Sequence, residues 1–131
     1  MTNPNSFIEL KENVQRHLED VKNALDSPNC QIDILPTKKG QSETDPYSTA
    51  YTMLKLEYDS SDVKEVLKKL KVEDYIESIK DNRKIDSPPF WVFGTEISEN
   101  QIYIKEKLRD HNNIFCVSFH FPKYPLKKGP Y

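Results

Sequence analysis

Apolar residues recur at helical spacing through the first part of the chain. They follow one another at intervals of three or four residues, at Phe7, Leu10, Val14, Leu18, Val21 and Leu25. This period predicts one amphipathic helix with a single apolar stripe. Ser6 is expected to cap the helix, with Glu9 three residues later completing a capping box, and Pro28 is expected to stop it.

A second helical stripe lies near the middle of the chain, at Val63, Val66, Leu67 and Leu70. Asp59 or Ser60 can cap this helix, because both side chains accept hydrogen bonds from free backbone N–H groups. Residues 51–56 and 73–79 show the same spacing over shorter lengths. They predict two further, short helical segments.

The segment that follows the first predicted helix has no helical period. Residues 31–36 alternate around two isoleucines and predict a short edge strand that ends at Pro36. Residues 36–48 combine turn formers with charges and show no periodicity, which predicts a loop.

The last third of the chain changes to a period of two. Residues 90–96 are rich in aromatic and β-branched types, residues 101–109 alternate, and residues 114–121 form a third such run. Short polar turns separate the three runs. The pattern predicts a three-stranded antiparallel meander after a helical half. This arrangement is an α+β fold, with helices packed on a twisted antiparallel sheet.

Composition narrows the function classes. The 131 residues fit one domain, which we expect to span residues 1–131. The 19 basic and 21 acidic residues give a net charge of −2, which excludes a polybasic protein that binds nucleic acid by bulk charge. With 3 glycines the chain contains no G-x-G-x-x-G or Walker spacing, so dinucleotide-binding and P-loop chemistry are excluded.

Cysteine spacing and the N-terminal sequence indicate a compartment. Cys30 and Cys116 form no C-x-x-C motif and have no histidine ligands nearby in sequence, so we expect two free, buried thiols and no zinc site. The chain starts without a basic segment followed by an apolar run, and its apolar stretches are too short to cross a membrane. We therefore expect a cytoplasmic protein.

The run at 101–109 places polar side chains on one face of the predicted sheet. Because side chains alternate, Ile102, Ile104 and Leu108 share the face that meets the helices. The opposite face then carries Gln101, Tyr103, Lys105, Lys107 and Arg109. A row of cations beside a phenol suits a polyanion. Basic residues also outnumber acidic ones from residue 90 onward, so the overall acidity lies in the helical half.

The run at 114–121 can add an imidazole to this face. Its apolar set is Phe115, Val117 and Phe119, so we expect Cys116, Ser118 and His120 on the same side as Lys105. Such a face can cleave RNA without a metal ion. A 2′-hydroxyl attacks the adjacent phosphorus, a base takes its proton, an acid protonates the leaving 5′-oxygen, and cations stabilise the phosphorane. A solvated polar face with a structural histidine is the alternative interpretation.

Four sequence blocks in the second half resemble the MqsR family of bacterial toxins. They are LEYDSSDVKEVLKKLKVEDYIESI, FWVFGTEI, QIYIKEKLRD and FCVSFHFPKYPL, which stand in the family's order and spacing within residues 54–126. The resemblance implies a RelE-like fold and an mRNA endoribonuclease that needs no metal and no cofactor. It also implies a type II toxin–antitoxin system, with a cognate antitoxin as partner and a dimer or a toxin–antitoxin hetero-oligomer as the assembly. Residues 36–48 look like an insertion relative to the family.

The resemblance also assigns site residues. The family's strand tyrosine falls on Tyr103, its following lysine on Lys105, and the basic position that ends the VSF block on His120. In the implied mechanism the tyrosine positions or deprotonates the 2′-hydroxyl, the histidine is acid or base, and the lysine stabilises the phosphorane. Two positions depart from the family's best-studied form, because Glu77 replaces a lysine and Val92 replaces a glutamine.

Further residues are expected to contact RNA. Lys107 and Arg109 would hold flanking phosphates, with Gln101 and Ser118 beside them on the same face. Trp91 or its neighbour at position 93 would stack a base if the ring turns outward, and core packing is the alternative for both rings.

Two other functions remain open. A catalytically impaired module that binds RNA or a protein is one, and the residues at positions 77 and 92 favour it. An anti-CRISPR-like counter-defence protein on a mobile element is the other.

Overall fold

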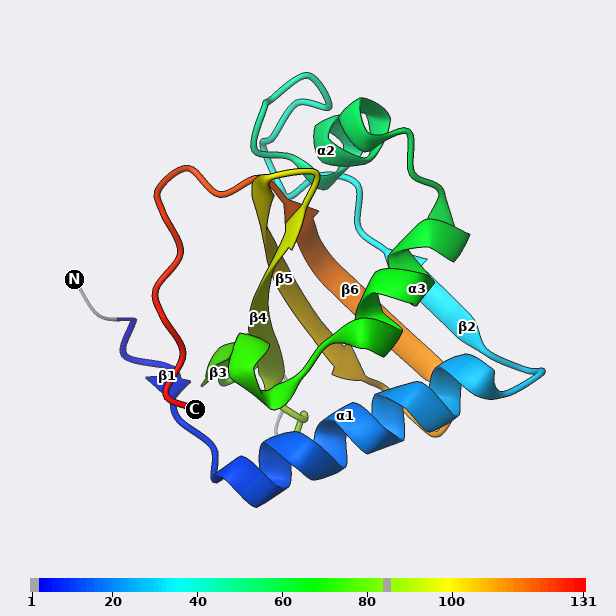
Figure 1. Cartoon of the computed structure of the whole chain (residues 1–131), viewed down its shortest axis with the longest axis vertical. Helices are drawn as coiled ribbons and strands as arrows, with labels where there is room; N and C mark the ends of the chain where they lie inside the picture. The colour runs from blue at the N-terminus through cyan, green and yellow to red at the C-terminus, as the bar shows by residue number, and fades with distance from the viewer. Residues whose placement is uncertain (1–2, 84–85) are drawn as a thin grey trace.

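Six strands and three helices form an α+β fold over residues 3–83 and 86–131, the part of the chain that the computed structural model describes (Figure 1). The strands are β1 (Ser6–Phe7), β2 (Gln31–Ile34), β3 (Tyr75–Ile79), β4 (Phe90–Ile97), β5 (Asn100–Leu108) and β6 (Asn113–His120). The helices are α1 (Lys11–Asp26), α2 (Thr49–Leu56) and α3 (Ser60–Lys69), with a 3₁₀ turn η1 (Val72–Asp74) before β3.

The strands form one sheet in the order β1-β3-β4-β5-β6-β2. The predicted meander of β4, β5 and β6 is confirmed, and β2 is an edge strand as expected. The sheet is not wholly antiparallel, however, because β2 runs parallel to β6. Helix α1 carries the chain from the edge of the sheet at β1 to the opposite edge at β2.

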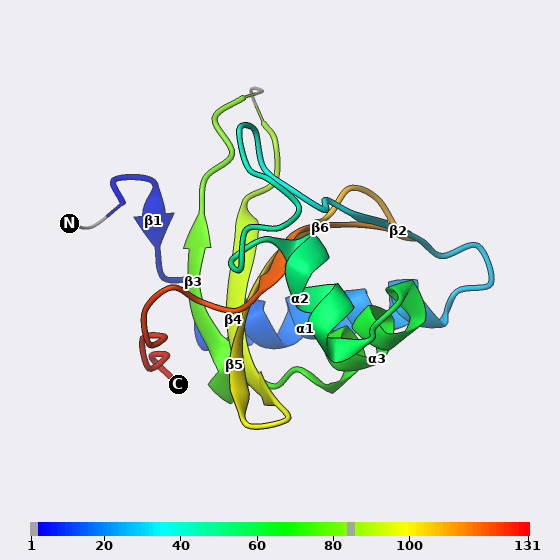
Figure 2. The same cartoon turned by 90° about the horizontal axis from the view of Figure 1, so that it is seen from above.

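Helices α1 and α3 cover one face of the sheet, which we call the inner face (Figures 1 and 2). The core between them contains Val14, Leu18 and Val21 from α1, Val63 and Leu67 from α3, and Ile102, Ile104, Ile114 and Phe119 from the sheet. Each such side chain contributes about 1.5–3 kcal/mol when it is fully buried. The opposite, outer face carries the polar side chains of β5 and is free of helices.

The N-terminal residues do not begin α1 as predicted. Ser6 and Phe7 pair with β3 as strand β1, and α1 starts only at Lys11 after an extended Leu10. The capping box of Ser6 and Glu9 is therefore wrong, because Ser6 uses its hydroxyl to bind Glu77 instead. The cap of α3 is confirmed at Asp59, whose side chain accepts from two backbone N–H groups in a full capping box.

The predicted helical segment at 73–79 is wrong over most of its length. Only a single 3₁₀ turn forms, and Tyr75–Ile79 is strand β3 between β1 and β4. Apolar residues of β3 are needed on both faces, because Tyr75 packs in the inner core while Ile76 and Ile79 join a smaller apolar cluster with Val92. Because β3 is buried on both faces, its sequence lacks the alternation of apolar and polar residues that would predict a strand.

A β-bulge in β6 corrects the predicted faces of that strand. Lys105 pairs with Ser118 but the next residue of β5 pairs with Cys116, so Val117 is an extra residue. After the bulge the alternation changes phase. Cys116 is therefore buried in the inner core, whereas Phe115 and Val117 lie beside Lys105 around an outer-face hollow.

Helix α2 closes the edge of the sheet where β2 ends. Strand β2 pairs with β6 only as far as Cys116. Beyond that point the backbone N–H groups of Phe119 and Phe121 donate to the hydroxyls of Thr49 and Thr52, each at 3.0 Å. Threonine side chains of α2 thus replace the missing strand as hydrogen-bond acceptors.

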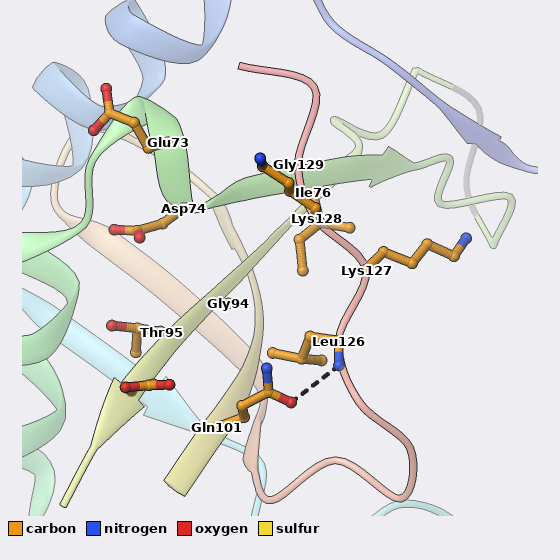
Figure 3. A pocket seen from close by; sticks show the side chains of 11 residues that line it. Glu73, Asp74, Ile76, Gly94, Thr95, Gln101, Leu126, Lys127, Lys128 and Gly129 are labelled. Atoms are coloured by element: carbon orange, nitrogen blue, oxygen red, sulfur yellow. Dashed lines mark hydrogen bonds between the residues drawn. The ribbon is translucent and has the colours of Figure 1, made fainter. Parts of the chain in front are cut away.

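The C-terminal tail after β6 crosses the outer side of β4 and β3 (Figure 3). Leu126 donates its backbone N–H to Gln101 Oε1 at 3.0 Å and packs over Gly94, where a Cβ would come within 2.7 Å of its side chain. Farther along, Gly129 lies against the backbone carbonyl of Tyr75, and the ring of Tyr131 stacks on Tyr75. The tail therefore packs along the outer side of β4 and β3 and ends against Tyr75, a residue of the inner core.

Within the described residues, no helix is both long enough and apolar enough to cross a membrane. Both cysteines are free, as expected. Cys116 is buried and Cys30 only partly so.

Candidate functional site

Tyr103, Lys105 and His120 lie together on the outer face. Alternation along β5 sends Ile102 and Ile104 into the core and turns Tyr103 and Lys105 outward. His120 is the direct partner of Tyr103 on β6, and their rings stack with centroids 5.3 Å apart. His120 lies on the C-terminal side of the bulge, and its predicted face is confirmed. Cys116 lies on the N-terminal side, and its predicted face is wrong.

The hydrogen bonds of His120 fix the role of each ring nitrogen. Nδ1 lies 2.9 Å from the carbonyl oxygen of Phe121, so this nitrogen carries a proton and donates it. In the neutral ring Nε2 is then an acceptor, and the ammonium of Lys38 lies 3.5 Å from it. The lone pair of a proton-transfer group thus accepts a long hydrogen bond from a cation.

Lys38 is a site residue that the sequence pattern did not reveal. It comes from the 36–48 loop, which links β2 to α2 and has no periodicity. The only sequence signal is the pair Lys38–Lys39, which begins two residues after Pro36 and four residues after β2 ends. The loop therefore contributes a cation to the site.

The cations of the site lose part of their solvation. Burial, and then the charge of Lys105, hold the pKa of Lys38 below its ordinary value. Burial also lowers the pKa of Lys105, as does the charge of Arg83, while Asp81 and Glu77 act in the opposite direction. Positive charges that repel one another in a partly buried place favour binding of an anion.

His120 is held neutral by the same surroundings. Burial is the main cause of its lowered pKa, and the charge of Lys38 lowers it further. The hydrogen bond to Phe121 and the charge of Asp45 oppose these effects. The imidazole is therefore neutral at pH 7 in the free protein.

Tyr103 stays a neutral phenol. Burial, and secondly the negative charge of Glu77, raise the pKa of Tyr103 to about 12. At neutral pH this side chain cannot take a proton from a substrate hydroxyl, but it can donate a hydrogen bond to an anion.

Glu77 and Val92 lie in the same cross-strand row as Lys105. Glu77 of β3 pairs with Val92 of β4, and Val92 pairs with Lys105 of β5. The hydroxyl of Ser6 donates to Glu77 Oε1 at 2.5 Å. The two positions that depart from the resembled family thus border the candidate site itself.

Lys107 is not a free cation. Its ammonium lies 2.6 Å from Asp81 Oδ2 and 3.1 Å from the Ser87 hydroxyl, and its side chain is buried. Arg83 holds the same carboxylate through two of its nitrogens. Lys105, Lys107 and Arg83 also surround the ring of Phe90, with cation–ring distances of 4.8, 4.6 and 5.6 Å. The predicted phosphate contact of Lys107 would require this network to open.

The remaining predicted RNA contacts are placed as follows. Arg109 lies over the ring of Phe115 and pairs with Asp33 at 2.8 Å, both near the surface. Gln101 accepts a hydrogen bond from the C-terminal tail. Ser118 is fully buried, although its register places it opposite Lys105.

Trp91 turns inward. It packs against His17 of α1, whose ring stacks on the indole at 4.1 Å and whose Nε2 lies 2.5 Å from the buried Glu106 Oε1. Phe93 is also buried in the inner core. Core packing is therefore the correct alternative for both rings, and neither offers a surface for stacking a base.

A surface hollow of about 450 Å³ continues the site towards the loop before β4. Its lining contains Arg83, Lys105, Phe90, Phe115 and Val117.

In the described part of the chain, no three side chains of His, Cys, Asp and Glu gather as the ligands of a metal ion would. Compared with known proteins, the chain matches no family model, no curated protein and no solved structure.

Proposed function

We propose that the protein is an endoribonuclease that cleaves single-stranded RNA by attack of a 2′-hydroxyl on the neighbouring phosphorus. The supporting observation is the group formed by Lys38, Lys105, Tyr103 and His120 on the outer face. Among the described residues, neither lysine is in an ion pair. Their charge is thus available to a phosphodiester.

Each residue of the group has a role that its surroundings favour. Lys38 and Lys105 neutralise the non-bridging oxygens as the phosphorane forms. Tyr103 donates a hydrogen bond from its neutral phenol and so positions the same phosphate. His120 transfers a proton through Nε2, because its Nδ1 is already bound to Phe121. The nucleophile belongs to the RNA, and the products are a 2′,3′-cyclic phosphate and a 5′-hydroxyl.

The biological setting is that of a toxin in a type II toxin–antitoxin system. The WVFG, IYIK and VSFH blocks support this setting through their resemblance to the MqsR family. In this proposal the α+β fold is RelE-like, mRNA is the substrate, and a cognate antitoxin blocks the outer face. Expression alone should then arrest growth, and Lys105→Ala, which leaves the core untouched, should relieve the arrest while the protein stays folded.

The test is incubation of the purified protein with one long unstructured RNA in the presence of a chelator. Cleavage should give fragments that end in a cyclic phosphate or in the 3′-phosphate derived from it. His120→Ala should be slower by about two to four orders of magnitude, the usual weight of general acid–base catalysis. Lys123→Ala, an exposed lysine in the tail, is the matched control and should cleave like the wild type. Intact RNA under these conditions, or cleavage only with added magnesium, would refute the proposal. RNA binding without cleavage would instead support the binding-module alternative.

A further inference from the structure

Most carboxylates near the outer face are already bound to cations. Asp81 is held by Arg83 and Lys107, and Asp33 is held by Arg109. Glu77 differs from them, because no described lysine or arginine lies within ion-pair distance of it. Glu77 is thus a carboxylate without a cation partner at the border of a cationic site.

The position of Glu77 is fixed by neighbouring strands. Strand β1 pairs with β3, and the hydroxyl of Ser6 holds Oε1 of the carboxylate at 2.5 Å. In the described chain no side chain or backbone group donates to Oε2. Between Glu77 and Lys105 in their row stands Val92, which has no polar side-chain atom. Two strand spacings, roughly 10 Å, therefore separate the backbones of the carboxylate and the lysine, and the side chain of Val92 between them is fully buried.

The charge of Glu77 reaches the site residues. It raises the pKa of Tyr103 and, less strongly than other neighbours, that of Lys105. With a pKa raised to about 12, the phenol of Tyr103 is protonated at neutral pH. It therefore cannot serve as the base of the proposed reaction. A different group must take the proton of the 2′-hydroxyl.

We propose that Glu77 is the general base of the proposed RNA cleavage and that His120 is the acid. This assignment rests on the proposed function. An in-line displacement needs base and acid on opposite sides of the phosphorus, and β3 and β6 flank the β4–β5 pair that carries Val92, Tyr103 and Lys105.

The proton balance is as follows. Glu77 takes the proton from the 2′-oxygen while that oxygen forms its bond to phosphorus. The bond from phosphorus to the 5′-oxygen breaks, and the imidazolium of His120 gives its Nε2 proton to that oxygen. One proton has then moved from the RNA to Glu77 and another from His120 to the RNA. Exchange with water restores both groups.

The bound substrate supplies the condition for His120 to act as an acid. In the free protein, Lys38 disfavours the imidazolium. A phosphodiester bound at Lys38 and Lys105 brings a negative charge that offsets the ammonium, so the imidazolium is favoured in the complex. The protonated fraction of His120 is thus higher in the substrate complex, where its proton is transferred, than in the free protein.

The experiment compares two RNA substrates that differ at the leaving atom. One is a short RNA with an ordinary scissile bond, and the other has sulfur in place of the 5′-oxygen. A thiolate leaves without protonation, so the sulfur substrate removes the need for the acid but not for the base. His120→Ala should be slow on oxygen and recover most of the wild-type rate on sulfur. Glu77→Gln should be slower by about two to four orders of magnitude on both substrates.

Two further variants keep the test decisive. Glu96→Gln changes an exposed carboxylate of β4 and should leave both rates unchanged. Glu77→Lys introduces the cation that the resembled family has at this position and should be as slow as Glu77→Gln. Circular dichroism and thermal melting confirm that each variant is folded.

The possible failures are distinguishable. If the wild type leaves both substrates intact, the proposed function and the inference are both overturned. If the wild type cleaves and Glu77→Gln or Glu77→Lys is as fast or faster, the endoribonuclease stands and the role of Glu77 is overturned. Recovery of Glu77→Gln on sulfur would make Glu77 the acid and equally overturn the assignment.

Discussion

The ammonium of Lys38 lies 3.5 Å from Nε2 of His120, although 82 residues separate them along the chain. The contact joins a loop without regular structure to the last residue of β6. It also places a fixed positive charge beside the group that is proposed to move a proton. The ionisation of His120 therefore depends on a residue outside the sheet.

Lys38→Met should raise the pKa of His120, because it removes a cation that opposes the imidazolium. A titration of the ring protons by nuclear magnetic resonance measures the change directly. Lys39→Met is the matched control, since it removes an adjacent, exposed lysine and should leave the titration of His120 in place. A shift to lower pH in the Lys38 variant would contradict the assigned contact.

Tyr103→Phe should lower RNA cleavage by about ten- to a hundredfold, the cost of a hydrogen bond to a charged group. The factor should be the same from pH 6 to pH 9, because the phenol has a pKa of about 12 and stays protonated throughout. Rate profiles of both proteins over this range test the point. Tyr124→Phe in the exposed tail serves as the control. A loss that grows with pH would mean that the phenolate takes part.

Asp81→Asn should destabilise the protein by about 3 kcal/mol, because it leaves the buried ammonium of Lys107 without a carboxylate. Urea denaturation at pH 7 measures the loss. Asp26→Asn removes the exposed pair with Lys68 and should cost much less, because solvent screens this pair. Equal losses in the two variants would show that burial of the Asp81 pair has no consequence for stability.

The same substitution has a defined pH dependence. Arg83, followed by Lys107, lowers the pKa of Asp81 far below its ordinary value in the folded state. A carboxyl with a depressed folded-state pKa contributes stability above its unfolded value of about 3.9 and loses that contribution as the pH falls. The difference between wild type and Asp81→Asn should therefore be full above about pH 5 and narrow in more acidic solution.

Gly129→Ala should detach the C-terminal tail. A Cβ at this position would overlap the carbonyl oxygen of Tyr75, and a backbone atom of the sheet cannot give way. Trypsin should then cut after Lys127 and Lys128 faster than in the wild type, while cleavage in the 36–48 loop at Lys39 provides the reference rate. Unchanged digestion of the tail would show that its packing on β3 is not maintained in solution.

Patterning predicted the meander because β5 alternates between polar and apolar residues and because β4 and β6 are rich in aromatic and β-branched types. It misplaced the half of β6 before the bulge, since an extra residue is invisible in the alternation until the partner strand is known. It also missed β3, whose residues Tyr75 and Ile76 are both buried, on opposite sides of the sheet.

The site was predictable to the extent that it lies on regular strands. Tyr103 and Lys105 follow from alternation along one strand, and the alternation also places His120 correctly because this residue lies beyond the bulge. Lys38 could not be found, because a loop brings it to the site and no local rule links a loop residue to a distant strand. The engagement of Lys107 by Asp81 was equally hidden, since it depends on how the segment before β4 folds back.

The two threonines of α2 have a consequence for association between molecules. Beyond Cys116, β6 has no partner strand on the β2 side. Unpaired backbone N–H groups there could pair with a strand from another copy, which is the usual start of aggregation through sheet edges. Thr49 and Thr52 occupy the donors of Phe119 and Phe121. The strands that remain at the two edges, β1 and β2, are two and four residues long. Replacing both threonines with valine at almost constant side-chain volume would leave these two N–H groups without acceptors beneath α2, so the closure of this sheet edge depends on two buried hydroxyl groups that belong to a helix.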